Sequence, residues 1–98
     1  MSTDNSAAAF DMSAAWCLHP QVAVRRERFG ALLYHFGTRR LSFVKTPQLL
    51  RVLQLLATEA SASAACAAAG IGEAEVTAYR RALATLASSS MIRERSQA

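Results

Sequence analysis

Residues 31–44 read ALLYHFGTRRLSFV, and this stretch decides the fold because it holds two apolar segments joined by a short polar link. The two segments, 31–36 and 41–44, alternate large apolar side chains with others at a period of two, which is typical of β-strands. The alternating side chains are Leu32, Tyr34, Phe36, Leu41 and Phe43. The link 37–40 contains a glycine and has the length of a hairpin connection. The stretch therefore predicts an antiparallel β-hairpin.

A third strand is predicted just before this hairpin. Residues 22–24 alternate valine and alanine before the polar pair Arg25 and Arg26, and Phe29-Gly30 marks a turn into the next strand. The three segments predict a three-stranded antiparallel meander. Because no fourth strand is predicted after it, strand 41–44 should lie at an edge of the sheet, with unpaired N–H and C=O groups.

Three helices are predicted after the sheet. Thr46 and Pro47 are typical of an N-cap and a first helical residue, and the apolar side chains that follow cover most of the helix circumference, so this helix should be the centre of the core. These side chains are Leu49, Leu50, Val52, Leu53, Leu55 and Leu56, which leave a narrow polar stripe of Arg51, Gln54 and Thr58.

Residues 61–69 are almost all Ala and Ser, and they read either as a short helix or as a low-complexity linker. In the first case, Ser61 or Ser63 would cap the helix and Gly70 would end it.

A longer helix is predicted to begin near Glu73. Glu73 and Glu75 in its first turn complement the helix dipole. One apolar stripe runs along it, at spacings of three, four and three residues: Val76, Tyr79, Leu83 and Leu86. The tight turn before it resembles that of a helix-turn-helix.

Length and composition bound the class of protein. Ninety-eight residues make one domain, which we expect to span residues 14–92 between an N-terminal tail, 1–13, and a C-terminal tail, 93–98. No apolar run approaches the roughly 18 residues that cross a bilayer. The N-terminus has no secretory signal pattern, so we expect a cytoplasmic protein with no membrane partner.

Catalytic chemistry has little support in the residues. Cys17 and His19 would share one side of an extended segment, but two ligands do not complete a metal site. His35 and Cys66 stand at no recognisable ligand spacing, and acidic residues are too sparse for a carboxylate pair. There is no phosphate-binding glycine loop. We expect no enzyme activity, no metal and no cofactor.

The charge distribution leaves two classes of partner open. The segment 20–57 holds a single acidic residue, Glu27, against seven basic ones: Arg25, Arg26, Arg28, Arg39, Arg40, Lys45 and Arg51. Such an excess suits an acidic peptide or nucleic acid, or only keeps a small domain soluble. A DNA-binding helix would present its N-terminal residues to phosphates, but these positions hold Glu73 and Glu75. Duplex DNA is therefore the alternative to a peptide, and we expect it to bind weakly.

Two stretches carry a resemblance to a known family. Residues 16–23, WCLHPQVA, and residues 27–43, ERFGALLYHFGTRRLSF, resemble the mycofactocin-system peptide chaperones. These are similar to the pyrroloquinoline-quinone peptide chaperones, which are stand-alone recognition elements for ribosomally made, modified peptides. The resemblance is strong over about residues 16–57.

The resemblance implies a winged-helix-like α+β fold, with three antiparallel strands followed by three helices. It implies that the leader of a precursor peptide adds as a strand beside the third strand, in a groove against the third helix. The protein would then present the peptide to a radical S-adenosylmethionine (SAM) maturase, and it would hold no cofactor itself. By position, the peptide-binding residues would be Arg39, Arg40, Leu41, Ser42, Phe43, Val44 and Lys45 on the strand side, and Val76, Tyr79, Arg80 and Leu83 on the helix.

The alternation in the strands predicts a second surface. If Leu41 and Phe43 face the helices, then Ser42 and Val44 face away from them, as do Leu33 and His35 on the neighbouring strand. Leu33 and Val44 would form an apolar patch in water, which is typical of an interface. We expect this patch to contact the maturase or a second copy of the chain.

Overall fold

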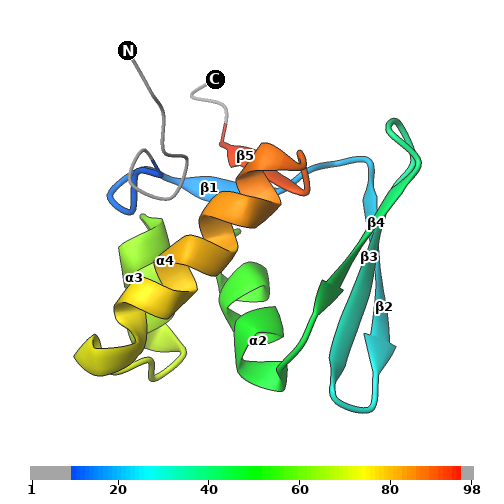
Figure 1. The fold of residues 1–98 in the computed structure, drawn as a ribbon. Helices are drawn as coiled ribbons and strands as arrows, with labels where there is room; N and C mark the ends of the chain where they lie inside the picture. Colours follow the sequence, from blue (N-terminus) through cyan, green and yellow to red (C-terminus); the bar gives the residue numbers. More distant parts are fainter. Residues whose placement is uncertain (1–9, 96–98) are drawn as a thin grey trace.

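The computed structural model describes residues 10–95 of the chain, and it is an α+β fold with two small sheets and three helices (Figure 1). The strands and helices follow one another as β1 (Trp16–Leu18), β2 (Val22–Glu27), β3 (Gly30–His35), β4 (Arg40–Val44), α2 (Pro47–Leu55), α3 (Ala62–Ala68), α4 (Glu73–Ser88) and β5 (Ile92–Glu94). The predicted antiparallel sheet and the three helices that follow it are confirmed. Within residues 10–95, no helix is both long and apolar enough to span a bilayer.

The main sheet is an antiparallel meander in the order β2-β3-β4. Its register pairs Leu33 with Val24 on one side and with Ser42 on the other. Gly30, at the start of β3, has its backbone so close to that of Val44 that a Cβ atom on it would lie 1.9 Å from the Val44 carbonyl oxygen. The turn before β3 therefore requires glycine at this position.

The predicted orientation of the sheet is wrong. Leu33, His35 and Val44 face the helices and are almost fully buried, as is Ala31. Leu41 and Phe43 face away and are each 61% exposed. The two sets were hard to tell apart from the sequence because both faces of this hairpin carry apolar side chains at period two. The smaller side chains pack against the helices, and the bulkier ones remain in water.

Helix α2 is the centre of the core, as predicted. The Thr46 hydroxyl oxygen accepts a hydrogen bond from the Leu49 N–H at 3.1 Å, and Pro47 occupies the first turn. Its buried side chains are Leu50, Val52 and Leu53, followed by Leu56. The helix packs against β3, α3 and β1.

The Ala- and Ser-rich segment forms helix α3, so the linker alternative is wrong. Ser61 caps it by accepting a hydrogen bond from the Ala64 N–H at 3.0 Å. Gly70 ends it with a φ of +83°, a left-handed conformation that glycine adopts without strain. The buried side chains of α3 are small, namely Ala62, Ala65 and Cys66. They allow α2 to approach closely.

A second sheet, which the sequence did not predict, joins the two ends of the described chain. Strand β1 pairs antiparallel with β5, so that Trp16 lies opposite Glu94. The Arg95 guanidinium donates to the carbonyl oxygens of Ala57 and Glu59 at 2.8 and 2.7 Å. Phe10 is buried and stacks on Trp16, with 4.4 Å between ring centroids.

The folded region therefore extends beyond the expected bounds of 14 and 92. Residues 10–13 and 93–95, which were expected in tails, take part in it. Phe10 and Met12 pack against the core, and residues 93 and 94 pair with β1 through their backbone, which does not require apolar side chains. Residues 1–9 and 96–98 of those tails lie outside the described part of the chain.

Candidate functional site

The candidate site is the groove between strand β4 and helix α4, hereafter the β4–α4 groove. Within residues 10–95, β4 pairs with β3 on one side and has no strand on the other, where α4 lies instead (Figure 1). An edge strand of this kind presents unpaired backbone N–H and C=O groups. Helix α4 stands too far away to fill the space beside them, and a hollow remains.

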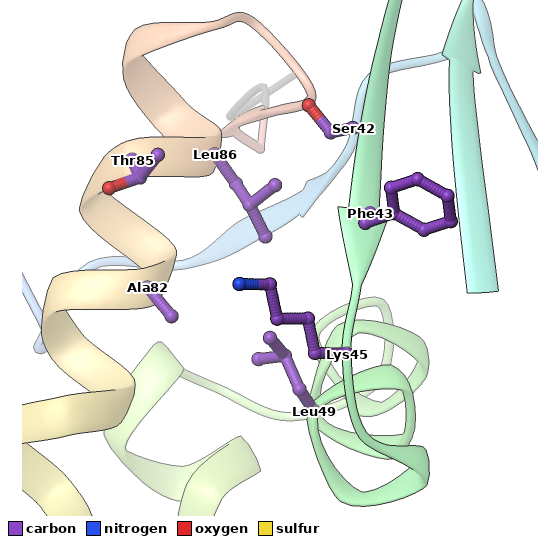
Figure 2. Close-up of a pocket in the computed structure, with 7 residues that line it drawn as sticks. All are labelled: Ser42, Phe43, Lys45, Leu49, Ala82, Thr85 and Leu86. Atoms are coloured by element: carbon purple, nitrogen blue, oxygen red, sulfur yellow. The ribbon is translucent and has the colours of Figure 1, made fainter. Parts of the chain in front are cut away.

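The centre of the groove is a hollow of about 450 Å³. It is lined by Ser42, Phe43, Lys45, Leu49, Ala82, Thr85 and Leu86. Figure 2 shows the Ser42 side chain and the Lys45 amine directed into the space between β4 and α4, with Leu49 and Leu86 beside them. The Phe43 ring points away from α4, toward the other face of the sheet. The hollow thus has an apolar base and one cation within it.

Two smaller hollows extend the groove at its ends. One, of about 180 Å³, is lined by Thr46, Leu49, Ala78, Tyr79 and Ala82. The other, of about 380 Å³, is polar and is lined by Thr38, Arg40, Ser88, Ser89 and Ser90. The first shares Leu49 and Ala82 with the central hollow. The helical part of the wall, from Ala78 to the end of α4 at Ser88, is about 15 Å long at 1.5 Å per residue. This length matches roughly four to five residues of extended chain at about 3.3 Å each.

The groove is electropositive. Lys45 lies in its centre and Arg40 at its polar end. Among residues 10–95, none of the side chains that line the three hollows is acidic. The ion pair of this region lies on β2, between Arg25 and Glu27 at 3.2 Å, and Lys45 makes none within the described chain. The groove therefore favours an anionic occupant over a cationic one.

The structure brings together some of the predicted peptide-binding residues. Arg40, Ser42, Phe43, Lys45 and Tyr79 all line the β4–α4 groove. Arg39 lies in the β3–β4 connection with a φ of 63°, outside the three hollows. Leu41 is directed to the exposed face of the sheet, and Val44 is buried in the core.

The predicted helical wall is rotated relative to the observed one. Leu83 is fully buried, and Val76 packs against the core, so both stabilise the fold rather than line the groove. Arg80 is exposed, but it lies two positions before Ala82, and at about 100° per residue this places it on the far side of α4. The apolar stripe of α4 identified the core-facing side, and the groove lies to one side of it.

The groove residues on α4 that were not predicted share a recognisable sequence pattern. Small side chains recur along α4 at spacings of four, three and four residues, at Ala78, Ala82, Thr85 and Ser89. This is a helical period, so they occupy one side of the helix. A face made of small side chains leaves space beside it.

The histidines and cysteines form no metal site in the described chain. His19 and His35 lie side by side, with 4.4 Å between ring centroids, and each accepts backbone N–H bonds at Nδ1. Burial, His35 and Arg93 lower the pKa of His19. Cys66 is buried in α3, and burial raises the pKa of its thiol. Among residues 10–95, no three His, Cys, Asp or Glu side chains cluster to hold an ion.

Comparison with known proteins identifies a family for the chain. The profile of the peptide chaperone MftB family matches residues 15–93. The chain is 52% identical over 86 residues to the peptide chaperone MftB of Mycobacterium ulcerans, and the aligned segment covers 88% of this chain and 79% of that relative. It is 52% identical over 83 residues to the peptide chaperone MftB of Mycobacterium tuberculosis, covering 85% and 76%. The chain belongs to the peptide chaperone MftB family.

Membership of the MftB family supports the sequence-based expectation of a protein that is not an enzyme. The peptide chaperone MftB of Mycolicibacterium smegmatis is 48% identical over 83 residues, covering 85% of this chain and 81% of that relative. No solved structure matches the chain. The matched residues 15–93 include both walls of the β4–α4 groove.

Proposed function

We propose that this protein binds the leader of a ribosomally made precursor peptide by β-strand addition to β4, and presents it to a radical SAM maturase in mycofactocin biosynthesis. The observation that carries the proposal is the open edge of β4 facing a hollow that α4 walls. Relatives named peptide chaperones supply the class of ligand.

Strand addition explains how one groove can hold a peptide with few side-chain requirements. A new strand would lie about 4.8 Å from β4 and pair with its backbone whatever its sequence is. Alternate side chains of this strand would point into the groove, toward Leu49, Ala82 and Leu86. Affinity would come partly from the backbone, and specificity from the side chains that these hollows admit.

The charge of the groove indicates the character of the leader. Lys45 and Arg40 stand along the path of the added strand, and no carboxylate in the described chain lines that path. An acidic side chain on the leader would pair with Lys45 in a partly desolvated setting, which strengthens the attraction. The proposal therefore includes a leader with at least one carboxylate near its centre.

A winged-helix-like fold and a cytoplasmic location belong to the same proposal. In this reading, the β-meander is the wing, and the peptide occupies the space between wing and helices. Duplex DNA is the alternative ligand for such a fold. The exposed Glu73 and Glu75 at the start of α4 disfavour it, because phosphates would be repelled there.

A pair of matched substitutions tests the groove. Thr85 and Thr77 are both exposed threonines on α4, but Thr85 alone of the two lines a hollow. Thr85→Phe should fill the central hollow and weaken binding of a fluorescently labelled precursor peptide by about tenfold or more, since a blocked pocket removes a central contact. Thr77→Phe should leave the affinity unchanged. Circular dichroism would show that both variants are folded.

The outcomes separate the two ligand classes. Tight binding of the precursor peptide that is equal in both variants would place the peptide site elsewhere. Sequence-selective binding of duplex DNA that persists at physiological salt would favour the alternative, because non-specific phosphate contacts weaken steeply with salt.

A further inference from the structure

The outer face of the main sheet carries an apolar patch that no helix covers. The patch, hereafter the outer sheet patch, consists of Leu32, Tyr34, Phe36, Leu41 and Phe43. The register places Leu32 beside Phe43 and Tyr34 beside Leu41, and the rings of Tyr34 and Phe36 meet edge to face at 5.3 Å between centroids. Figure 1 shows the three helices on one side of the sheet, and Figure 2 shows the Phe43 ring directed to the other. The five side chains therefore form one continuous surface.

Three of the five apolar side chains of the outer sheet patch are more than half exposed to solvent. Phe36, Leu41 and Phe43 are 59%, 61% and 61% exposed, although the buried face of the same strands holds smaller side chains. A contiguous apolar patch of this kind on a small domain marks a surface that another molecule covers. Aromatic side chains are also enriched in the central contacts of protein interfaces.

The charge around the patch indicates what covers it. Residues 22–44, which form the main sheet, contain five arginines and a single acidic residue, Glu27, so the sheet carries a net charge of +4. Two copies of the chain packed sheet to sheet would bring these charges together, which disfavours self-association. A surface with an apolar centre and an acidic border would complement the sheet. The patch also contains two aliphatic side chains, Leu32 and Leu41, which favours a protein over stacked bases, since aliphatic side chains offer no ring for stacking.

We infer that the outer sheet patch docks a partner protein whose contact surface has an apolar centre and an acidic border, and that, within the proposed function on which this inference rests, the partner is the maturase. Strand β4 would then serve both ligands. Its open edge would receive the peptide, and its outward side chains Leu41 and Phe43 would touch the partner. The peptide would thus be held directly beside the docking surface.

The test compares two double variants, each of which changes one exposed Phe to Ser and one aliphatic side chain to Thr. The first, Phe36→Ser with Leu32→Thr, removes two side chains of the patch and changes neither the core, the lining of the groove nor strand β4. The second, Phe29→Ser with Val24→Thr, removes side chains that are 58% and 38% exposed outside the patch. Each protein is titrated against the immobilised, purified maturase, and separately against labelled precursor peptide in the absence of the maturase.

The first variant should bind the maturase about tenfold or more weakly than wild type, as expected when central interface contacts are truncated, with peptide affinity retained. The second should bind both ligands like wild type. Equal maturase binding by both variants, or no maturase binding by the wild type, would overturn the inference. So would a wild-type dimer in sedimentation that the first variant converts to monomer, or single-stranded oligonucleotide binding that only the first variant loses. Failure of the wild type to bind peptide would instead overturn the proposed function.

Discussion

The carbonyl oxygen of Val44 lies where the side chain of any residue but glycine at position 30 would begin. A Cβ atom built on Gly30 falls 1.9 Å from that oxygen and 2.9 Å from the Val44 carbonyl carbon. The contact joins the start of β3 to the end of β4, the strand that forms the open edge. Because the carbonyl oxygen and carbon of Val44 belong to the backbone, they cannot move away from an added Cβ atom without shifting the sheet.

Gly30→Ala should therefore destabilise the protein strongly. We expect the free energy of unfolding to fall by about 2 kcal/mol or more, in the range of overpacked sites. Gly72→Ala is the matched control, since a Cβ there meets no atom within 4 Å. It should lower stability by no more than about 1 kcal/mol, because Ala is a poorer N-cap than Gly but creates no clash at this position. Urea denaturation of the three proteins measures the difference, and equal stabilities would contradict the contact.

Reversing one charge in the groove and reversing one on the far side of α4 should affect peptide affinity differently. Lys45→Glu places a carboxylate in the central hollow, and we expect precursor peptide to bind about tenfold more weakly, with the loss shrinking as salt is raised. Arg80→Glu makes the same change of charge on the far side of α4 and should leave affinity nearly unchanged. If Arg80→Glu weakened binding as much as Lys45→Glu, net charge rather than the groove would determine affinity.

The two serines at the start of α3 should respond differently to truncation. Ser61 accepts the capping hydrogen bond from Ala64, whereas Ser63 is exposed in the first turn. Ser61→Ala should lower the free energy of unfolding by about 1 kcal/mol through the loss of the cap. Ser63→Ala should be neutral or slightly stabilising, since Ala is the better helix former. The reverse order in thermal or urea unfolding would place the helix start elsewhere.

The lowered pKa of His19 makes stability depend on pH. Burial, the neighbouring His35 and the Arg93 charge favour neutral His19 in the folded protein, so the unfolded chain binds more protons below its ordinary pKa of about 6.5. The contribution of His19 is therefore complete above that pH and declines as the pH falls toward the folded-state pKa. His19→Asn keeps an acceptor for the Gln21 N–H and removes the titration.

Urea denaturation at pH 7.5 and at pH 5.0 measures this effect. The wild type should lose more stability than His19→Asn between the two conditions. An equal loss in both proteins would assign the pH dependence to other groups.

Local signals in the sequence predicted the hairpin and the helices well. The cap of Thr46 and Pro47, and the end of α3 at Gly70, depend on backbone conformations that a few neighbouring residues determine. The face of the sheet could not be predicted in this way, because Leu33 and Val44 compete with Leu41 and Phe43 for the core. Only the packing against α2 decides between the two sets.

Features that depend on residues far apart in the sequence could not be predicted, for a related reason. The pairing of Trp16 with Glu94 joins residues at opposite ends of the chain through three-residue strands, which carry no periodic pattern. On α4, the apolar stripe predicted the side that packs on the core, and Leu83 lies there. The position of the groove followed from the small residues beside that stripe, such as Ala78 and Ala82, whose meaning depends on where β4 ends.

The pairing of β1 with β5 also determines where the chain enters and leaves the domain. Trp16 and Glu94 lie opposite each other, so the first and last strands of the domain are neighbours (Figure 1). A domain with adjoining ends can be inserted into a loop of a host protein, or circularly permuted, without straining its interior. The same geometry would let it be fused to an enzyme through a short connection at either end, leaving its sheet free to face the host.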